Sequence, residues 1–265
     1  MLPSQRRQAI LAEIRTETAV SAEALARLYG VSVETIRRDL RSLHGEGLLT
    51  RVYGGATKPS VRSNEGSFAA RSARNIDRKR AIAELAASLI GPDETLILDV
   101  GTTALEVARA LPLAFRGRVL TNSVPVAMEL SSRDGVDVLI CGGQVRAGDA
   151  ACSGAHAEAF FSEFYADRAF LGSGGVHVEA GLTDYYPAEV VVRRTIIAHS
   201  AESYVLADSS KLGVIAVHRV CSLDRVTAVI TDNQENATEY EALEATGVSL
   251  LRAESSARRP LRTVT

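Results

Sequence analysis

The sequence has no run of about 18 uncharged apolar residues, so we expect no transmembrane helix. Its first 15 residues carry charges throughout and lack the apolar core of a signal peptide, so we expect a cytoplasmic protein. The few cysteines, Cys141, Cys152 and Cys221, have the spacing of neither a disulfide framework nor a metal site. We interpret them as buried thiols, with a redox sensor as the alternative. No motif indicates a metal, a nucleotide or a covalent cofactor.

Charge is distributed unevenly along the 265 residues. Residues 1–80 contain 15 Lys/Arg against 8 Asp/Glu, a net charge of +7, whereas residues 81–265 carry −9, which gives −2 overall. A cationic segment joined to an acidic body is typical of a polyanion-binding module fused to another domain. Surface charge also serves solubility. The cationic segment therefore indicates nucleic-acid binding only if it also contains a motif that can recognise a nucleic acid.

Residues 5–58 supply such a motif. We expect helices at 5–17 and 22–29, and a third from Ser32 to about His44. Gly30 stands where a left-handed residue ends a helix, and a three-residue turn between two helices is the helix-turn-helix layout.

The second and third helices have apolar faces. Ser21 is a good N-cap for the second helix, in which Leu25 and Leu28 are expected to face inward. In the third helix the apolar residues lie on one narrow face and the arginines lie opposite, where a helix presents its side chains to a major groove. The narrow face consists of Ile36, Leu40 and Leu43.

Arg37 and Arg38 are candidates for contacts to guanine edges or phosphates, whereas for either residue alone a solvated helix face is the favoured alternative. The whole arrangement of caps, turn, stripe and basic face favours DNA binding. Residues 48–53 predict a strand, and Gly54-Gly55 predicts a hairpin turn after it. We therefore expect a two-stranded wing that places Arg51 and Lys58 along the DNA backbone or the minor groove. The candidate DNA-binding residues are Ser32, Thr35, Arg37, Arg38, Arg41 and Arg51.

The run V-S-V-E-T-I-R-R-D-L at 31–40, followed by L-L-T-R-V-Y-G-G-A at 48–56, resembles the DeoR family of bacterial regulators. Tyr53 stands where the family usually has His. The resemblance continues to about Asp232. It implies a repressor whose sensor domain is similar in fold to ribose-5-phosphate isomerase and responds to phosphorylated sugars or related metabolites.

From residue 95 onward, apolar runs alternate with helical stretches. This alternation predicts an α/β fold, with a parallel sheet covered on both faces and ligands bound beyond the carboxyl ends of its strands. Strands are expected at 95–100, 118–121, 136–140, 166–172, 203–207 and 228–231. Helices are expected at 77–90, 103–111, 124–130, 155–163, 187–201 and 236–245.

Glycine and polar residues follow these strands. The first loop opens a helix whose free N–H groups suit a phosphate, although Thr102 can equally be a simple cap, and the Gly-Lys-Ser/Thr ending of a P-loop is absent. Turn glycines and a solvated lysine are the plain alternative, but several such loops at one sheet edge favour a site. The candidate effector residues are Asp99, Gly101, Thr102, Thr103, Asn122, Gly142, Gly143, Arg146, Asp184 and Lys211.

The family resemblance implies roles for some of these residues. Asp99 and Asn122 recognise hydroxyl groups, while the loop amides and Lys211 contact an anion. Arg146 and Asp184 are further candidates. Glu189 either orients Lys211 or caps the helix that begins at residue 187.

The expected organisation is a winged helix-turn-helix at 1–58, a linker at 59–74, a sensor domain at 75–252 and a disordered tail at 253–265. The predicted function is repression of a carbohydrate-metabolism operon by a homo-oligomer, a dimer or a tetramer, that leaves double-stranded operator DNA when a sugar phosphate binds. One alternative is a sugar-phosphate isomerase with a DNA-binding appendage, which the lack of a clear acid/base pair disfavours, so we expect no enzyme. Another is constitutive DNA binding with a purely structural large domain.

Overall fold

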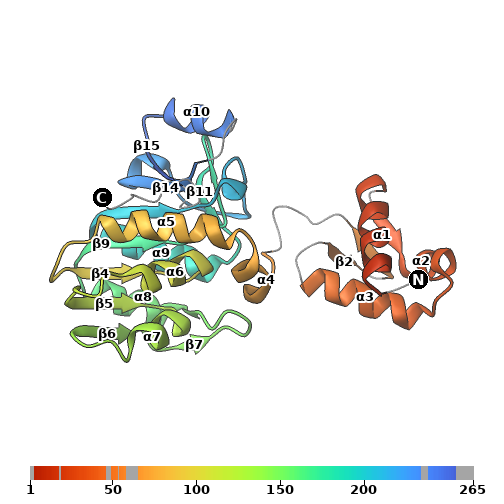
Figure 1. Cartoon of the computed structure of the whole chain (residues 1–265), viewed down its shortest axis with the longest axis horizontal. Helices are drawn as coiled ribbons and strands as arrows, with labels where there is room; N and C mark the ends of the chain where they lie inside the picture. The colour runs from red at the N-terminus through yellow and green to blue at the C-terminus, as the bar shows by residue number, and fades with distance from the viewer. Residues whose placement is uncertain are drawn as a thin grey trace, which may run out of the picture. The chain divides into compact units, whose positions relative to one another are not determined.

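The fold was analysed in a computed structural model that describes residues 3–17, 19–45, 49–52, 54–57, 65–233 and 238–254. The chain forms two compact units, Met1–Arg71 and Ser72–Thr265, whose elements are labelled in Figure 1. Within the described ranges, no helix has the length and apolar character needed to cross a membrane. Tyr53, Lys58 and most of the expected tail, 255–265, lie outside the described residues.

The first unit combines helices with a small antiparallel sheet. Its helices are α1 (Pro3–Thr16), α2 (Ala22–Tyr29) and α3 (Val33–Gly45). The strands lie in the order β1 (Ala19–Ser21), β3 (Gly55–Thr57), β2 (Thr50–Val52). The expected hairpin of β2 and β3 is therefore joined by a third strand, which the sequence did not predict. A winged helix-turn-helix is confirmed.

The predicted helix caps are confirmed. Ser21 Oγ accepts a hydrogen bond from the Ala24 N–H, and Gly30 adopts a left-handed φ of 64° while its N–H donates to the Ala26 carbonyl. Ser32 Oγ accepts from the Thr35 N–H at 3.1 Å. These bonds satisfy amide and carbonyl groups that helix ends leave without partners.

The apolar stripe of α3 is also confirmed, because Ile36, Leu40 and Leu43 are buried in the core of the unit. The prediction for Leu28 was wrong, since its side chain is 61% exposed. The buried face of α2 is centred on Ala22, Leu25 and Ala26, and Leu28 lies about 110° around the helix from that centre at 100° per residue.

The second unit contains a seven-stranded sheet in the order β15-β14-β12-β9-β4-β5-β6, and all of its neighbouring pairs are parallel. The edge strand β15 was not predicted, although Leu250, Leu251 and Ala253 are apolar; most of its residues are exposed or only partly buried. The strands are β4 (Thr95–Leu98), β5 (Gly117–Thr121), β6 (Val136–Ile140), β9 (Ala166–Leu171), β12 (Ser200–Leu206), β14 (Ala228–Asp232) and β15 (Ser249–Ala253).

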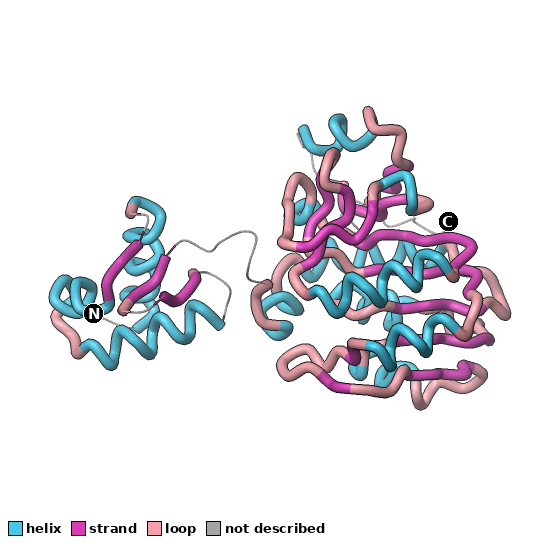
Figure 2. The backbone as a smooth tube through the Cα atoms, turned by 180° about the vertical axis from the view of Figure 1, so that it is seen from behind, coloured by secondary structure: helices cyan, strands magenta, loops and turns pink. Residues whose placement is uncertain are grey.

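Helices cover both faces of this sheet, as predicted (Figures 1 and 2). On one face lie α5 (Ile76–Ser88), α6 (Thr102–Ala110) and α7 (Val124–Leu130), and on the other α8 (Ala155–Ser162) and α9 (Pro187–Ala198). The short helix α4 (Phe68–Ala73) precedes α5, and α10 (Thr238–Glu244) packs near β15.

The strand order reverses at β4. This strand continues through α6 to β5 on one side, whereas β9 lies on its other side and leads through α9 to β12. In parallel sheets such a switch point opens a crevice at the carboxyl ends of the strands. Further short elements follow these ends: the sheet of β10 (Gly175–His177), β11 (Gly181–Asp184) and β13 (His218–Cys221), the pair β7 (Gln144–Val145) and β8 (Cys152–Ser153), and the 3-10 turns η1 (Ser209–Lys211) and η2 (Leu223–Arg225).

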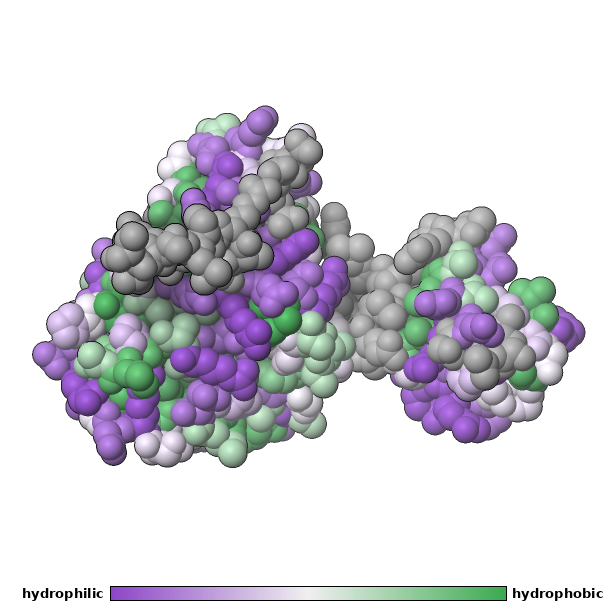
Figure 3. Space-filling model, viewed as in Figure 1, coloured by the Kyte–Doolittle hydropathy of each residue, from purple (hydrophilic) through white to green (hydrophobic). Residues whose placement is uncertain are grey.

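On the face of the second unit seen in Figure 3, hydrophilic and hydrophobic residues are intermixed. The most exposed large apolar side chains of this unit, Leu113, Tyr165 and Met128, come from separate elements. Single exposed apolar side chains are ordinary in soluble proteins. Hydropathy on this face therefore does not mark one surface for oligomer formation.

A buried ion pair joins α1 to α3. Arg6 Nε lies 2.5 Å from Asp39 Oδ2, and their side chains are 8% and 9% exposed. Arg7 adds a hydrogen bond of 3.0 Å to Ser42 Oγ on the same helix. Asp39, in the middle of the arginine-rich run, therefore holds α3 in place.

We expect Asp39→Ala to destabilise the first unit by about 3–5 kcal/mol, because the Arg6 guanidinium stays buried without its carboxylate. Amide hydrogen exchange in α1 and α3 of the full chain measures this loss of protection. Glu34→Ala, at a position 65% exposed on the same helix, is the control and should leave exchange nearly unchanged. Wild-type exchange rates in Asp39→Ala would show that the pair does not hold the two helices together.

Candidate functional site

The face of α3 opposite its apolar stripe carries exposed arginines. Arg37 and Arg41 form loose ion pairs of 3.8 Å and 3.6 Å with Glu34, and Arg38 is exposed beside them. Exposed ion pairs of this kind are weak, so another anion can replace the Glu34 carboxylate as the partner of these guanidinium groups.

The hydroxyl residues and the wing lie near this face. Ser32 Oγ and Thr35 Oγ1 are 2.8 Å apart at the beginning of α3, where the helix dipole favours an anion. A shallow pocket of about 180 Å³ between α3 and the wing is lined by Arg37, Arg51 and Gly54 among others. The structure therefore brings predicted cations from α3 and β2 to one groove.

In the second unit, Asp99 follows β4 and is fully buried. Its Oδ2 accepts hydrogen bonds from Arg193 Nε at 2.6 Å and from the Gly172 N–H at 3.0 Å. Its Oδ1 has no hydrogen-bond partner among the described residues. One oxygen of the carboxylate thus joins α9 to the end of β9, whereas the other oxygen is buried without a partner in the described part of the chain.

Arg193 is the central cation of the site, and the sequence analysis missed it. Its buried side chain also forms ion pairs with Asp184 and with Glu189 Oε2, the latter at 3.3 Å. Burial works against its charge, but Asp184, Asp99 and Glu189 together keep the pKa of Arg193 above its ordinary value. The available sequence signal was Glu189 four residues before Arg193, on the inward face of a largely apolar helix.

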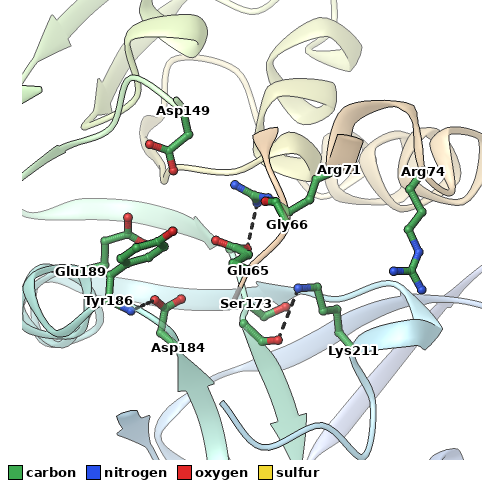
Figure 4. A network of polar contacts seen from close by, with 12 residues as sticks. Glu65, Gly66, Arg71, Arg74, Asp149, Ser173, Asp184, Tyr186, Glu189 and Lys211 are labelled. Atoms are coloured by element: carbon green, nitrogen blue, oxygen red, sulfur yellow. Dashed lines mark hydrogen bonds and ion pairs between the residues drawn. The ribbon is translucent and has the colours of Figure 1, made fainter. Parts of the chain in front are cut away.

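Glu189 forms ion pairs with Arg193 and Arg146, contacts that differ from both roles expected of it. Arg146 also pairs with Asp149, and its guanidinium lies 3.6 Å from the centre of the Tyr186 ring. Burial raises the pKa of Glu189 to about 8, with the Asp184 charge acting in the same direction and both arginines against it. Figure 4 shows Asp149, Asp184, Tyr186 and Glu189 at this part of the site.

Asn122 lies beside Asp99, because Leu98 and Thr121 are paired in register at the ends of β4 and β5. The Asn122 side chain is fully buried, and neither its oxygen nor its nitrogen has a hydrogen-bond partner among the described residues. A buried polar group without a partner costs about 1–3 kcal/mol. This amide and Asp99 Oδ1 are therefore two buried polar groups at neighbouring strand ends that have no partner among the described residues.

The loop after Asp99 leads into α6. Gly101 has a φ of 137°, which a residue with a side chain rarely adopts, and it begins the helix without a side-chain cap. Thr102 is the first residue of the helix rather than its cap, and Thr103 follows it. Among the described residues, no side chain caps the first N–H groups of α6, and α6 begins directly after the loop that follows β4.

Lys211 ends the η1 turn. Its Nζ donates to the Gly174 carbonyl at 3.4 Å and lies 5.7 Å from the centre of the Tyr185 ring. Figure 4 shows its side chain directed toward Ser173. Gly142 and Gly143, at the end of the edge strand β6, border open space and the His156 side chain respectively.

Cys141 and Cys152 are buried and Cys221 is half-buried, which largely confirms the interpretation of the cysteines as buried thiols. Burial raises the pKa of Cys141 to about 12 and that of Cys221 to about 11. Thiolate is the reactive form, so these shifts weigh against the redox alternative.

A helix-turn-helix unit joined to an α/β unit with a buried cluster of polar residues at its strand ends is typical of a transcription regulator with a sensor domain. Family models agree with this class. The DeoR-like helix-turn-helix domain matches residues 6–62, and the DeoR C terminal sensor domain matches residues 74–233. The chain belongs to the DeoR family.

Full-length relatives support the assignment. The HTH-type transcriptional regulator GlpR of Haloferax volcanii is 34% identical over 251 residues, which cover 95% of this chain and 98% of the relative. The glycerol-3-phosphate regulon repressor of Escherichia coli is 34% identical over 88% of this chain and 92% of its own length. Such relatives are regulators rather than enzymes, and this chain is a DNA-binding transcription regulator, not an enzyme.

Solved structures similar to this chain include ribose 5-phosphate isomerase A from Methanocaldococcus jannaschii, with a TM-score of 0.39 and 19% identity over 52% of this chain and 54% of that one. A probable sor operon regulator from Shigella flexneri gives a TM-score of 0.43 and 10% identity over 64% of this chain and 90% of its own.

The raised pKa of Glu189 predicts a pH dependence of stability. Because its pKa rises from 4.5 to about 8 on folding, the protonated carboxyl stabilises the fold fully below about pH 4.5, and this contribution is lost as the pH rises past about 8. We expect the melting temperature to fall less for Glu189→Gln than for the wild type between about pH 6 and about pH 9. Calorimetry on the full chain measures this, with Glu158→Gln on the exposed face of α8 as the control. Equal slopes for wild type and Glu189→Gln would contradict the shift.

Proposed function

We propose that this protein is a cytoplasmic repressor of a carbohydrate-metabolism operon. It binds operator DNA as a homo-oligomer, a dimer or a tetramer, and leaves the DNA when a phosphorylated sugar or related metabolite occupies the crevice of the second unit. The observation that carries the proposal is a pair of buried groups, Asp99 Oδ1 and the Asn122 amide, that have no partner within the described part of the chain and lie near the beginning of α6. Relatives described as a glycerol-3-phosphate regulon repressor and a putative aga operon repressor support the ligand class.

The groups of the crevice suit the two ends of a sugar phosphate. An ionised carboxylate only accepts hydrogen bonds, so Asp99 Oδ1 selects a hydroxyl group, and the Asn122 amide both donates and accepts. The first N–H groups of α6 and the Lys211 ammonium suit the phosphate. Asp184 and Arg146 act one step further away, through Arg193 and Glu189.

The α3 face supplies the DNA contacts. Arg37, Arg38 and Arg41 face the major groove, while Ser32 and Thr35 donate to a phosphate at the beginning of the helix. Arg51 on the wing contacts the adjoining backbone. One helix-turn-helix buries little DNA surface, which favours two copies on a two-fold operator.

We expect Arg38→Ala to weaken operator binding about 5- to 150-fold, the equivalent of about 1–3 kcal/mol. Effector affinity should not change, because the residue lies in the first unit. The measurement is an electrophoretic mobility shift at fixed salt, on the upstream region of the gene and on a scrambled duplex. Arg118→Ala, which removes the same charge from the exposed side of β5, is the control. Unchanged operator affinity would exclude Arg38 from the interface, and an equal loss on both duplexes would assign it to phosphate.

Asn122→Leu tests the crevice with two effects of opposite sign. Removing a buried amide without partners should stabilise the ligand-free protein by about 1–3 kcal/mol, whereas effector binding should be lost. The measurement is a thermal shift with a panel of triose, pentose and hexose phosphates, where a ligand at 100 times its dissociation constant adds about 2.7 kcal/mol.

Thr231→Val is the matched control, because the buried Thr231 hydroxyl also has no partner in the described part of the chain but lies on β14. This variant should gain stability and keep the effector response. A normal response in Asn122→Leu would place the ligand elsewhere.

A further inference from the structure

A cluster of polar contacts joins the beginning of α5 to the turn that carries Lys211. Asn75 Nδ2 donates to Asp208 Oδ1 at 3.2 Å, and an Arg78 N–H donates to Ser209 Oγ at 2.8 Å. Arg78 Nε also lies 3.7 Å from Asp232 Oδ2. We call these residues, Asn75, Arg78, Asp208, Ser209 and Asp232, the α5–η1 cluster.

The two carboxylates of this cluster fix the η1 turn. Asp208 Oδ1 accepts from the Ser210 N–H at 3.0 Å, and Asp232 accepts from both the N–H and the hydroxyl of Ser209, at 2.6 Å and 3.1 Å. Both aspartates are buried. The Lys211 N–H donates to the Asp208 carbonyl at 2.8 Å, so the position of Lys211 follows the position of the turn.

The backbone of Asn75 is unusual for a residue that precedes a helix. It has a φ of 56° in the left-handed region, and its side chain makes no cap bond to α5. Such a conformation costs about 1 kcal/mol or more in a residue other than glycine, and it persists where surrounding contacts over-determine it. The hydrogen bond to Asp208 is one such contact, and the Lys79 Nζ bond to the Arg74 carbonyl at 2.7 Å is another close by.

Asn75 also occupies a special place in the chain, because the second unit begins at Ser72. The segment that arrives from the DNA-binding unit therefore meets the sensor unit within a few residues of the cluster. The side chains of Asn75 and Arg78 contact the η1 turn and its cap residue directly.

We propose that the α5–η1 cluster couples effector binding to DNA release. An anion bound at Lys211 shifts the η1 turn, and Asn75 and Arg78 transmit this shift to the beginning of α5 and so to the preceding segment. The proposal rests on the proposed function, since it requires an anionic effector at Lys211. These residues are positioning residues, which touch neither the effector nor the DNA.

The test uses Asn75→Gly and Arg78→Leu in the full chain. Glycine accepts the left-handed backbone without strain, so Asn75→Gly removes the bond to Asp208 and keeps the fold. Arg80→Leu is the control, because it removes the same charge from the same helix at a residue that pairs with Asp77 and Glu106 instead. The probe is the sugar phosphate, among glycerol 3-phosphate, ribose 5-phosphate and glucose 6-phosphate, that most raises the wild-type melting temperature.

Three quantities are measured: operator affinity without the probe, operator affinity with saturating probe, and probe affinity without DNA. Coupled sites typically change each other's affinity about 5- to 150-fold. We expect Asn75→Gly and Arg78→Leu to keep operator affinity without the probe, and probe affinity without DNA, within a few-fold of wild type. The factor by which saturating probe lowers operator affinity should fall most of the way to one. A wild-type ratio in both variants would overturn the proposal.

Hydrogen exchange at residues 209–213 provides a readout that needs no effector. Exchange should be faster in Asn75→Gly and Arg78→Leu than in the wild type and Arg80→Leu, because the contacts that hold the turn are missing. Wild-type exchange rates at residues 209–213 in both variants would by themselves refute the proposed role of the α5–η1 cluster. A wild-type protein that responds to no probe, but shows this difference in exchange, would instead refute the proposed effector class and leave the mechanical link between α5 and η1 supported.

Discussion

The geometry of the sensor site depends on the buried guanidinium of Arg193. A buried guanidinium is tolerated only where acceptors surround its N–H donors, and here the acceptors are Asp99, Asp184 and Glu189. Asp99 follows β4, Asp184 ends β11, and Glu189 lies in the first turn of α9. The ion pairs of Arg193 with all three therefore fix the position of the loop after β4 relative to the end of β11 and the start of α9. Gly172 completes this arrangement, because a Cβ there would lie 2.5 Å from the Val100 carbonyl oxygen.

This arrangement also separates the crevice into two chemical regions. Arg193 and the Gly172 N–H occupy Asp99 Oδ2, whereas Oδ1 has no partner among the described residues and can act as an acceptor. A phosphate placed there would meet the carboxylate charge, with only the neutral Asn122 amide as a donor beside it. The proposed phosphate donors lie elsewhere, at the beginning of α6 and on Lys211. The proposed effector therefore has one orientation, with its hydroxyl groups toward Asp99 and Asn122 and its anionic group toward the loops.

The features that the sequence predicted depend on residues close together in the chain, whereas the features that it missed depend on contacts between residues far apart in the sequence. The helices of the first unit and the central strands depend on local caps and apolar periodicity, so residues such as Ser21, Gly30 and Ile36 predicted them directly. The pairing of β1 with β3 depends on distant partners, and strands of three residues carry little signal of their own. The edge strand β15 contains the apolar pair Leu250 and Leu251, but its place beside β14 also depends on a distant partner. Arg193 was missed for the same reason, since a charged residue in a helix is usually solvated and its partner Asp99 is 94 residues away.

The two units have separate hydrophobic cores, so regulation does not require α3 to change its own structure. The Arg6–Asp39 pair keeps α3 fixed within its unit. In an oligomer on a two-fold operator, affinity also depends on the spacing of two recognition helices, which must match half-sites about 34 Å apart. In the proposed mechanism, a displacement of the segment before α5 alters that spacing. The contact between α5 and η1 is the step that would carry the effect of a bound anion to the segment that leads to the DNA-binding unit.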